Sequence, residues 1–80
     1  MNIKILAFGI AKDIFGQPHI SIETPENGTV ASLRQILEEQ YPELRRLASY
    51  MIAVNNEYGA NETPVGEKDE IALIPPVSGG

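Results

Sequence analysis

The stretch from residue 30 to residue 41 constrains the fold most, because it predicts the one main helix of the chain. Apolar side chains recur there at helical spacing and form one stripe, which consists of Val30, Leu33, Ile36, Leu37 and Tyr41. We expect the side chains between them to face water: Arg34, Gln35, Glu38 and Glu39. Thr29 is a predicted N-cap, and Pro42 ends the helix because the residue before a proline avoids the α region. One helix can cover only one face of a sheet, so the other residues must supply that sheet.

Short strands separated by turns account for most of the remaining chain. We expect strands at residues 2–8, 19–23, 51–54, 57–58 and 71–74. Asn55 and Asn56 predict a two-residue hairpin turn, because asparagine tolerates positive φ better than most residues. Short helical segments are expected at 10–15, closed by Gly16, and at 42–48, where Leu44 and Leu47 would be buried. The 80 residues therefore predict one α+β domain, a small mixed sheet covered on one face by one main helix.

The first and last strands carry apolar residues on both faces. Four of these are expected to meet the helix: Ile3, Ile5, Ile71 and Leu73. Strand alternation then turns four others outward: Leu6, Phe8, Ala72 and Ile74. An exposed apolar patch on a small protein marks a docking surface, unless a short helix or loop covers it.

Composition and charge exclude several classes of function. The chain has no cysteine, which excludes disulfides, a thiol nucleophile and a zinc site built on thiolates. The one histidine, His19, cannot form a metal site alone, and the carboxylates show no calcium or magnesium spacing, so we expect no metal. A net charge of −5 argues against nucleic acid and anionic membrane surfaces and suits a basic partner. No stretch has the apolar length of a membrane helix, and we expect a cytoplasmic protein.

The last residues, 75–80, predict a tail that projects from the domain. Pro75 and Pro76 have fixed φ and favour extended geometry, so they would hold residues 77–80 away from the body. Gly79 and Gly80 carry no side chain and would pass through a narrow channel into another enzyme. The terminal carboxylate is ionised at neutral pH and is a poor acyl donor until it is activated, for instance as a mixed anhydride with AMP. We find no internal catalytic triad, phosphate loop or acid pair that competes with this interpretation.

Several of these stretches resemble one known family. Residues 69–80, ending in Pro-Pro-Val-Ser-Gly-Gly, resemble the end of the molybdopterin synthase small subunits (MoaD), which are ubiquitin-like β-grasp sulfur carriers. Residues 53–58 are similar to the third strand and hairpin of that family, and residues 3–8 and 41–44 also fit. Two departures are Lys12-Asp13, where Arg-Glu is common, and Lys68, where the family usually has glycine. A positive φ at Lys68 would strain that turn by about 1 kcal/mol.

The resemblance implies a β-grasp fold and a specific chemistry. An E1-like enzyme would adenylate the Gly80 carboxylate with ATP, and a sulfur donor would convert it to a thiocarboxylate. The loaded tail would then enter the large synthase subunit (MoaE-like) and pass its sulfur to cyclic pyranopterin monophosphate. The chain itself would bind no cofactor and would act as the sulfur-donor subunit of the complex. The residues implied in partner binding are Phe8, Tyr58, Ile74, Pro75, Pro76, Val77 and Ser78, with Gly79 and Gly80 at the reacting end.

Three alternatives stay open at this point. A sulfur carrier for thiamine synthesis shares the fold and the Gly-Gly end but usually lacks the diproline. A ubiquitin-like modifier would use the same tail to join lysines of other proteins. A plain docking subunit would only fit its tail into a groove. The choice between molybdenum and tungsten cofactors, the oligomeric state and conjugation to other proteins are not determined by the sequence.

Overall fold

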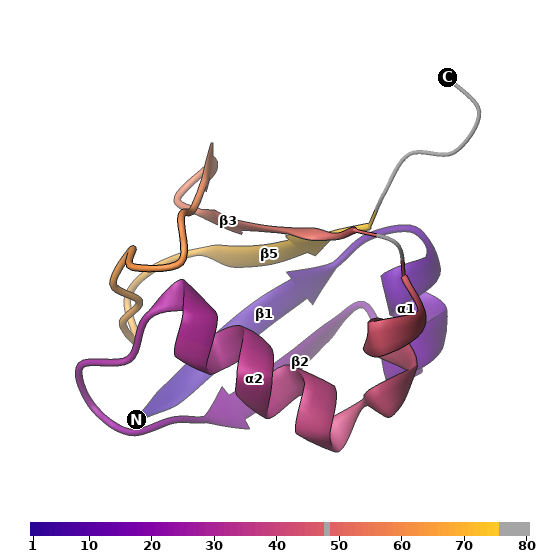
Figure 1. Cartoon of the computed structure of the whole chain (residues 1–80), viewed down its shortest axis with the longest axis horizontal. Helices are drawn as coiled ribbons and strands as arrows, with labels where there is room; N and C mark the ends of the chain where they lie inside the picture. Colours follow the sequence, from indigo (N-terminus) through magenta and orange to yellow (C-terminus); the bar gives the residue numbers. More distant parts are fainter. Residues whose placement is uncertain (48, 76–80) are drawn as a thin grey trace.

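The sheet and its helices follow one another along the chain in the order that the sequence predicts. The structure, a computed structural model, describes residues 1–47 and 49–75. Its elements are β1 (Asn2–Ala7), α1 (Ile10–Phe15), β2 (His19–Glu23), α2 (Val30–Gln40), the 3-10 helix η1 (Pro42–Arg46), β3 (Met51–Val54), β4 (Glu57–Tyr58) and β5 (Ile71–Ile74). Figure 1 shows α2 lying across one face of the sheet. The predicted arrangement, a mixed sheet under one main helix, is confirmed.

The two ends of the chain form neighbouring strands in the middle of the sheet. The strand order is β2-β1-β5-β3-β4, and β1 pairs with β5 in parallel, with Leu6 opposite Ala72. The other three pairings are antiparallel. Because β1 and β5 are central, their side chains lie in the middle of both faces of the sheet. One face of β1 and β5 therefore contributes to the core under α2, and the other face forms the middle of the outer surface of the sheet.

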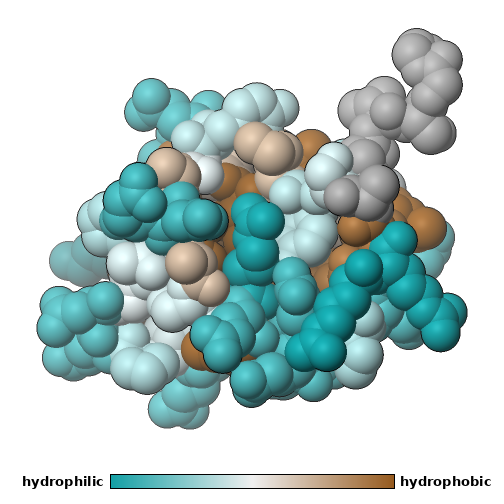
Figure 2. All heavy atoms as spheres, viewed as in Figure 1, coloured by the Kyte–Doolittle hydropathy of each residue, from teal (hydrophilic) through white to brown (hydrophobic). Residues whose placement is uncertain are grey.

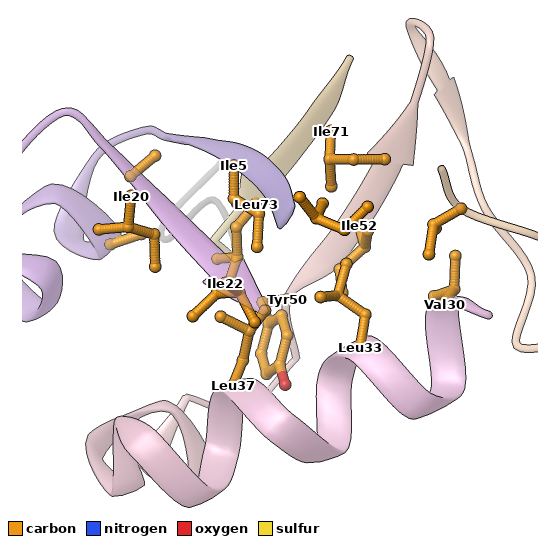
Figure 3. Packing of buried hydrophobic residues seen from close by; sticks show 14 of the residues in the cluster. Ile5, Ile20, Ile22, Val30, Leu33, Leu37, Tyr50, Ile52, Ile71 and Leu73 are labelled. Carbon is orange, nitrogen blue, oxygen red and sulfur yellow. The ribbon is translucent and has the colours of Figure 1, made fainter. Parts of the chain in front are cut away.

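The core lies between α2 and the inner face of the sheet. Val30, Leu33 and Leu37 of α2 are fully buried and point towards the strands in Figure 3. Opposite them are the buried side chains Ile3, Ile5, Ile22, Ile52, Ile71 and Leu73. Burying one such side chain contributes roughly 1.5–3 kcal/mol. The predicted inward and outward faces of β1 and β5 are confirmed by the alternating burial of these strands, and β2 alternates in the same way.

Local side-chain chemistry fixes where α2 begins and how β3 turns into β4. Thr29 is the N-cap of α2, as predicted, and its Oγ1 accepts a hydrogen bond from the Ser32 N–H at 3.3 Å. The Ser32 hydroxyl accepts one in return from the Thr29 N–H at 2.8 Å, which completes a capping box. Asn55 and Asn56 have φ values of 54° and 70°, so both central residues of the hairpin turn are left-handed. The predicted two-residue turn is therefore confirmed.

Two side chains that were expected to face water instead pack against Tyr50. Arg34 places its guanidinium 4.9 Å from the centre of the Tyr50 ring, and Glu38 accepts a hydrogen bond from the Tyr50 hydroxyl. Tyr50 itself is buried between α2 and the sheet, as Figure 3 shows. Burial, together with the hydrogen bond to the Glu38 carboxylate, raises the pKa of Tyr50 above its ordinary value. Arg34 and Glu38 therefore face water only in part, because Glu38 supplies the polar partner that a buried tyrosine hydroxyl needs and Arg34 lies over the ring.

The segment after α2 also differs from the sequence expectation. A 3-10 helix, η1, ends at Arg46, where an α-helix reaching residue 48 was expected; residue 48 lies outside the described residues. Leu44 is buried as predicted, whereas Leu47 is only partly buried. The conditional strain at Lys68 does not arise, because the only described non-glycine residues with positive φ are Asn27, Asn55 and Asn56.

Candidate functional site

A hollow of about 330 Å³ lies on the face of the sheet that α2 does not cover. It is lined by residues from β1, β3, β4 and β5 and from the segments that flank them, which are Leu6, Phe8, Ala53, Asn56, Tyr58, Glu70, Ala72 and Ile74. We call this hollow the outer groove. Its apolar residues include all four side chains that the alternation of the first and last strands predicts to face outward. None of the elements in the described residues covers it, because Phe8 and Tyr58 keep 50% and 66% of their surface exposed.

The strand register explains why this face is hollow. Ala72 of β5 pairs with Leu6 on one side and with Ala53 on the other, and Ala53 pairs in turn with Tyr58. Two alanines therefore form the floor, and larger side chains stand around them. Ile74 lies two residues beyond Ala72 and so projects from the same face of β5. The structure thus brings Phe8, Tyr58 and Ile74 to one groove, although they are far apart in the sequence.

One end of the outer groove is polar, and sequence reasoning missed it. The Asn55 side chain accepts a hydrogen bond from the Glu70 N–H at 2.9 Å and donates one to Asp69 at 3.0 Å. The other carboxylate oxygen of Asp69 accepts from the Gly66 N–H at 2.8 Å. These bonds fix the backbone from which Glu70 and Asn56 reach the groove. The signal was present in the sequence, since Glu70 directly precedes β5 and continues its alternation to the face of Ala72 and Ile74.

The chain leaves the sheet beside the other end of the groove. Pro75 follows Ile74 directly and is the first residue of the predicted tail, 75–80, whose other residues lie outside the described part of the chain. Gly9 lies against it, because a β-carbon built on Gly9 would be 3.2 Å from the Cγ atom of Pro75. Gly9 has a φ of 56° and a ψ of −132°, a conformation that glycine adopts readily and other residues rarely do. The predicted site residues Pro76, Val77, Ser78, Gly79 and Gly80 lie outside the described residues.

A second hollow, of about 300 Å³, lies between α1 and η1. Its lining residues are Ile10, Asp13, Ile14, Glu43, Arg46 and Leu47. In Figure 2 hydrophobic surface gathers on the side of the molecule where α1 lies in Figure 1. Sequence reasoning missed this hollow, although the spacing of Ile10 and Ile14 places both on one face of a helix.

The described residues hold no group of three histidine, cysteine or acidic side chains placed to bind a metal ion. None of the helices in this part of the chain has both the length and the apolar character that a bilayer-spanning segment needs. His19 is exposed on β2, whose burial alternates residue by residue. The outer groove, apolar with a polar end, offers a surface for binding.

The chain is similar to known proteins over nearly its whole length. Residues 5–80 match the ThiS family. A molybdopterin synthase sulfur carrier subunit from Arabidopsis thaliana is 33% identical over 81 residues, covering 100% of this chain and 84% of that protein. One chain in the structure of the complex between subunits 1 and 2 of molybdopterin-converting factor from Helicobacter pylori is 30% identical to this chain. The TM-score is 0.69, and the match covers the full length of both chains. SAMP1 from Haloferax volcanii has a TM-score of 0.84 over the full length of both chains, but at 24% identity this likeness shows the fold alone.

Proposed function

This chain belongs to the ThiS family, and within it to the molybdopterin synthase sulfur carrier subunits (MoaD family), and from this premise we propose that its Gly80 carboxylate carries sulfur as a thiocarboxylate. The sulfur-carrier role itself follows from the family. The observation that best supports sulfur loading at Gly80 is that the family match extends through the Gly-Gly end at residue 80. The proposal requires that Gly80 has a free α-carboxylate in the working protein.

The chemistry begins with activation of that carboxylate. An E1-like enzyme would join a Gly80 carboxylate oxygen to the α-phosphorus of ATP, releasing pyrophosphate and leaving an acyl adenylate. A sulfur nucleophile then attacks the acyl carbon, a carbon–sulfur bond forms, and AMP departs. When the sulfur arrives as a persulfide, two electrons from a thiol release the thiocarboxylate. Glycine at positions 79 and 80 suits these steps, because no β-carbon crowds the reacting carbonyl.

Transfer of the sulfur would take place in the large subunit of molybdopterin synthase. The thiocarboxylate would donate sulfur to cyclic pyranopterin monophosphate, and water would return Gly80 to the carboxylate. A dithiolene contains two sulfurs, so each product requires two loaded tails. This chain would act as the sulfur-donor subunit, binding no cofactor and leaving ATP to the activating enzyme. We place these reactions in the cytoplasm.

The outer groove supports the docking part of the proposal. Phe8 and Ile74 stand at the end of the groove from which the chain continues to Pro75 and the tail. A partner that covers this end would hold the tail beside its own active site. The related subunit of Helicobacter pylori molybdopterin-converting factor was solved in complex with the other subunit, which is consistent with a large-subunit partner here. An apolar groove that the chain leaves exposed suits such a partner.

The proposal is tested by reconstituting synthesis of molybdopterin with and without Gly80. The full chain, an activating enzyme, ATP, a sulfur donor and the large subunit should convert cyclic pyranopterin monophosphate to molybdopterin. The chain that ends at Gly79 should give none, while its circular dichroism spectrum and thermal midpoint stay unchanged. A matched control, Glu62→Gln in the exposed loop, should retain full activity. Synthesis supported by the shortened chain would refute the carrier role of Gly80.

The same reconstitution separates the alternative functions. A thiamine-pathway carrier would become loaded with sulfur but would fail to convert the pterin precursor. A protein modifier would yield higher-mass adducts joined to lysines of other proteins. A plain docking subunit would bind the large subunit and never acquire sulfur.

A further inference from the structure

We propose that the partner covering the outer groove places a basic side chain, arginine or lysine, against the carboxylate of Glu70 and the amide of Asn56. The inference rests on the proposed docking function and names the chemistry that the partner must bring to this groove. The apolar end would then receive apolar side chains of the partner, and the polar end would receive its cation. The groove would thereby select a partner by charge as well as by shape.

Glu70 is held rigidly at its backbone while its carboxylate is available. The Glu70 N–H donates to the Asn55 Oδ1 at 2.9 Å, and the Glu70 carbonyl accepts from the Asn55 N–H at 2.8 Å. In contrast, Asp69 uses both of its carboxylate oxygens within the protein, on Asn55 and Gly66. Within residues 1–47 and 49–75, the Glu70 carboxylate forms neither a hydrogen bond nor an ion pair. Of these two neighbouring acids, Glu70, which lines the groove, is therefore the one without a partner among the described residues.

Among residues 1–47 and 49–75, no lysine or arginine forms an ion pair with Glu70. Lys4 precedes Ile5, the residue paired with Ile71 in the parallel β1–β5 register, but it forms no ion pair with Glu70. The one ion pair among the described residues instead joins Arg45 to Glu38, at 3.7 Å on the far side of the domain by α2. The whole chain carries a net charge of −5, so long-range attraction also favours a basic surface.

Loss of hydration at the Glu70 carboxylate is the reason that the partner must supply a cation. A partner that fills the apolar hollow excludes water from its rim, and an ionised carboxylate loses hydration when it is covered. A cation that hydrogen-bonds the carboxylate offsets that loss, and a guanidinium does so with two donors at once. Asn56 contributes an amide oxygen at the same end, since its exposed side chain also lines the groove. A purely apolar partner surface would leave Glu70 buried and unpaired.

The test measures binding of the full chain to the large molybdopterin synthase subunit of the same organism by surface plasmon resonance at low and high salt. We expect Glu70→Gln to raise Kd about tenfold and Glu70→Lys about a hundredfold or more. The association rate of Glu70→Gln should also depend less on salt than that of the unaltered chain. Glu62→Lys, the same charge change on an exposed residue outside the groove, should change Kd by less than about threefold. Phe8→Asp serves as the second variant and should weaken binding through the apolar end.

The outcomes separate the inference from the proposed function. Normal binding by Glu70→Lys, alongside weakened binding by Phe8→Asp, would overturn the basic contact and leave the groove as the docking site. Normal binding by both variants would overturn the inference and the docking face together. Neither result would bear on sulfur loading at Gly80, which is tested separately by removing Gly80. Weakening by both, with Glu62→Lys unaffected, supports the inference.

Discussion

Gly9 and Pro75 lie against each other where β1 ends and the C-terminal segment leaves the sheet, with 3.2 Å between a β-carbon built on Gly9 and the Pro75 Cγ. The contact joins residues 66 positions apart in sequence (75 − 9) and lies next to Phe8 and Ile74 of the outer groove. Two features of Gly9 matter here, its positive φ and its lack of a side chain. Together they let the chain reach Pro75 without displacing it.

Gly9→Ala should therefore disturb both the backbone and the start of the tail. We expect a loss of unfolding free energy of about 1–3 kcal/mol from the unfavourable φ and the close contact. Gly16→Ala is the matched control, because Gly16 also has a positive φ, 77°, but its β-carbon would meet nothing within 4 Å. Urea unfolding measures the stability of both variants. Only Gly9→Ala should also slow sulfur transfer; equal transfer rates in the two variants would show that the Pro75 contact does not position the tail.

Phe8→Asp should weaken binding to the large subunit by about 30-fold or more, since it places a charge in an apolar contact that the partner desolvates. Ile10→Asp is the matched control, because Ile10 has a nearly equal exposed fraction, 51% against 50%, but lines the second hollow. Isothermal titration calorimetry gives both affinities. If Ile10→Asp lowered the affinity as much as Phe8→Asp, the docking face would extend over α1 and the outer groove alone would not define it.

Tyr50→Phe should reduce unfolding free energy at neutral pH by about 1–3 kcal/mol, because Glu38 loses a donor that bonds its charged carboxylate. Its pH dependence should also change. The pKa of Tyr50 is raised in the folded chain, so the unfolded chain loses that proton first above its ordinary value of about 10. Stability should thus fall as pH rises above about 10 in the unaltered chain, and fall less steeply in Tyr50→Phe. Parallel pH profiles in chemical denaturation would contradict this account of Tyr50.

The two residues of the β3–β4 turn should respond differently to glycine. Both have positive φ, so glycine fits both backbones, but only Asn55 also bonds Asp69 and Glu70 with its side chain. Asn55→Gly should cost about 1–2 kcal/mol, whereas Asn56→Gly should stay within about 0.5 kcal/mol of the unaltered chain. Thermal and urea unfolding compare the pair. A loss at Asn56 equal to that at Asn55 would mean that backbone conformation, and not the side-chain bonds, sets the cost.

The sequence predicts those features that depend on neighbouring residues. Strand alternation placed Leu6, Phe8 and Ile74 outward, and the helical stripe placed Leu33 and Leu37 inward, because each pattern follows from the backbone period alone. Capping by Thr29 and the Asn55-Asn56 turn were likewise predictable, since one or two side chains determine them.

Features that depend on contacts between distant residues were not predictable. The Tyr50 hydroxyl donates to Glu38, and Arg34 lies over the Tyr50 ring. These residues meet only when the segment before β3 packs under α2, so no local pattern predicts the contacts. The Gly9–Pro75 contact arises from the parallel pairing of the first and last strands, which no local pattern specifies. Glu70 directly precedes β5, and its place in the outer groove depends on the neighbouring strands that line the groove with it.

Intact mass spectrometry of the full chain after incubation with the activating enzyme, ATP and the sulfur donor tests the central claim most directly. One oxygen should be replaced by one sulfur, and fragmentation should assign the change to Gly80. The Arabidopsis thaliana sulfur carrier subunit, incubated with its own enzymes, serves as a positive control. An unchanged mass while that control is converted, or a sulfur assigned to any residue other than Gly80, would contradict the account.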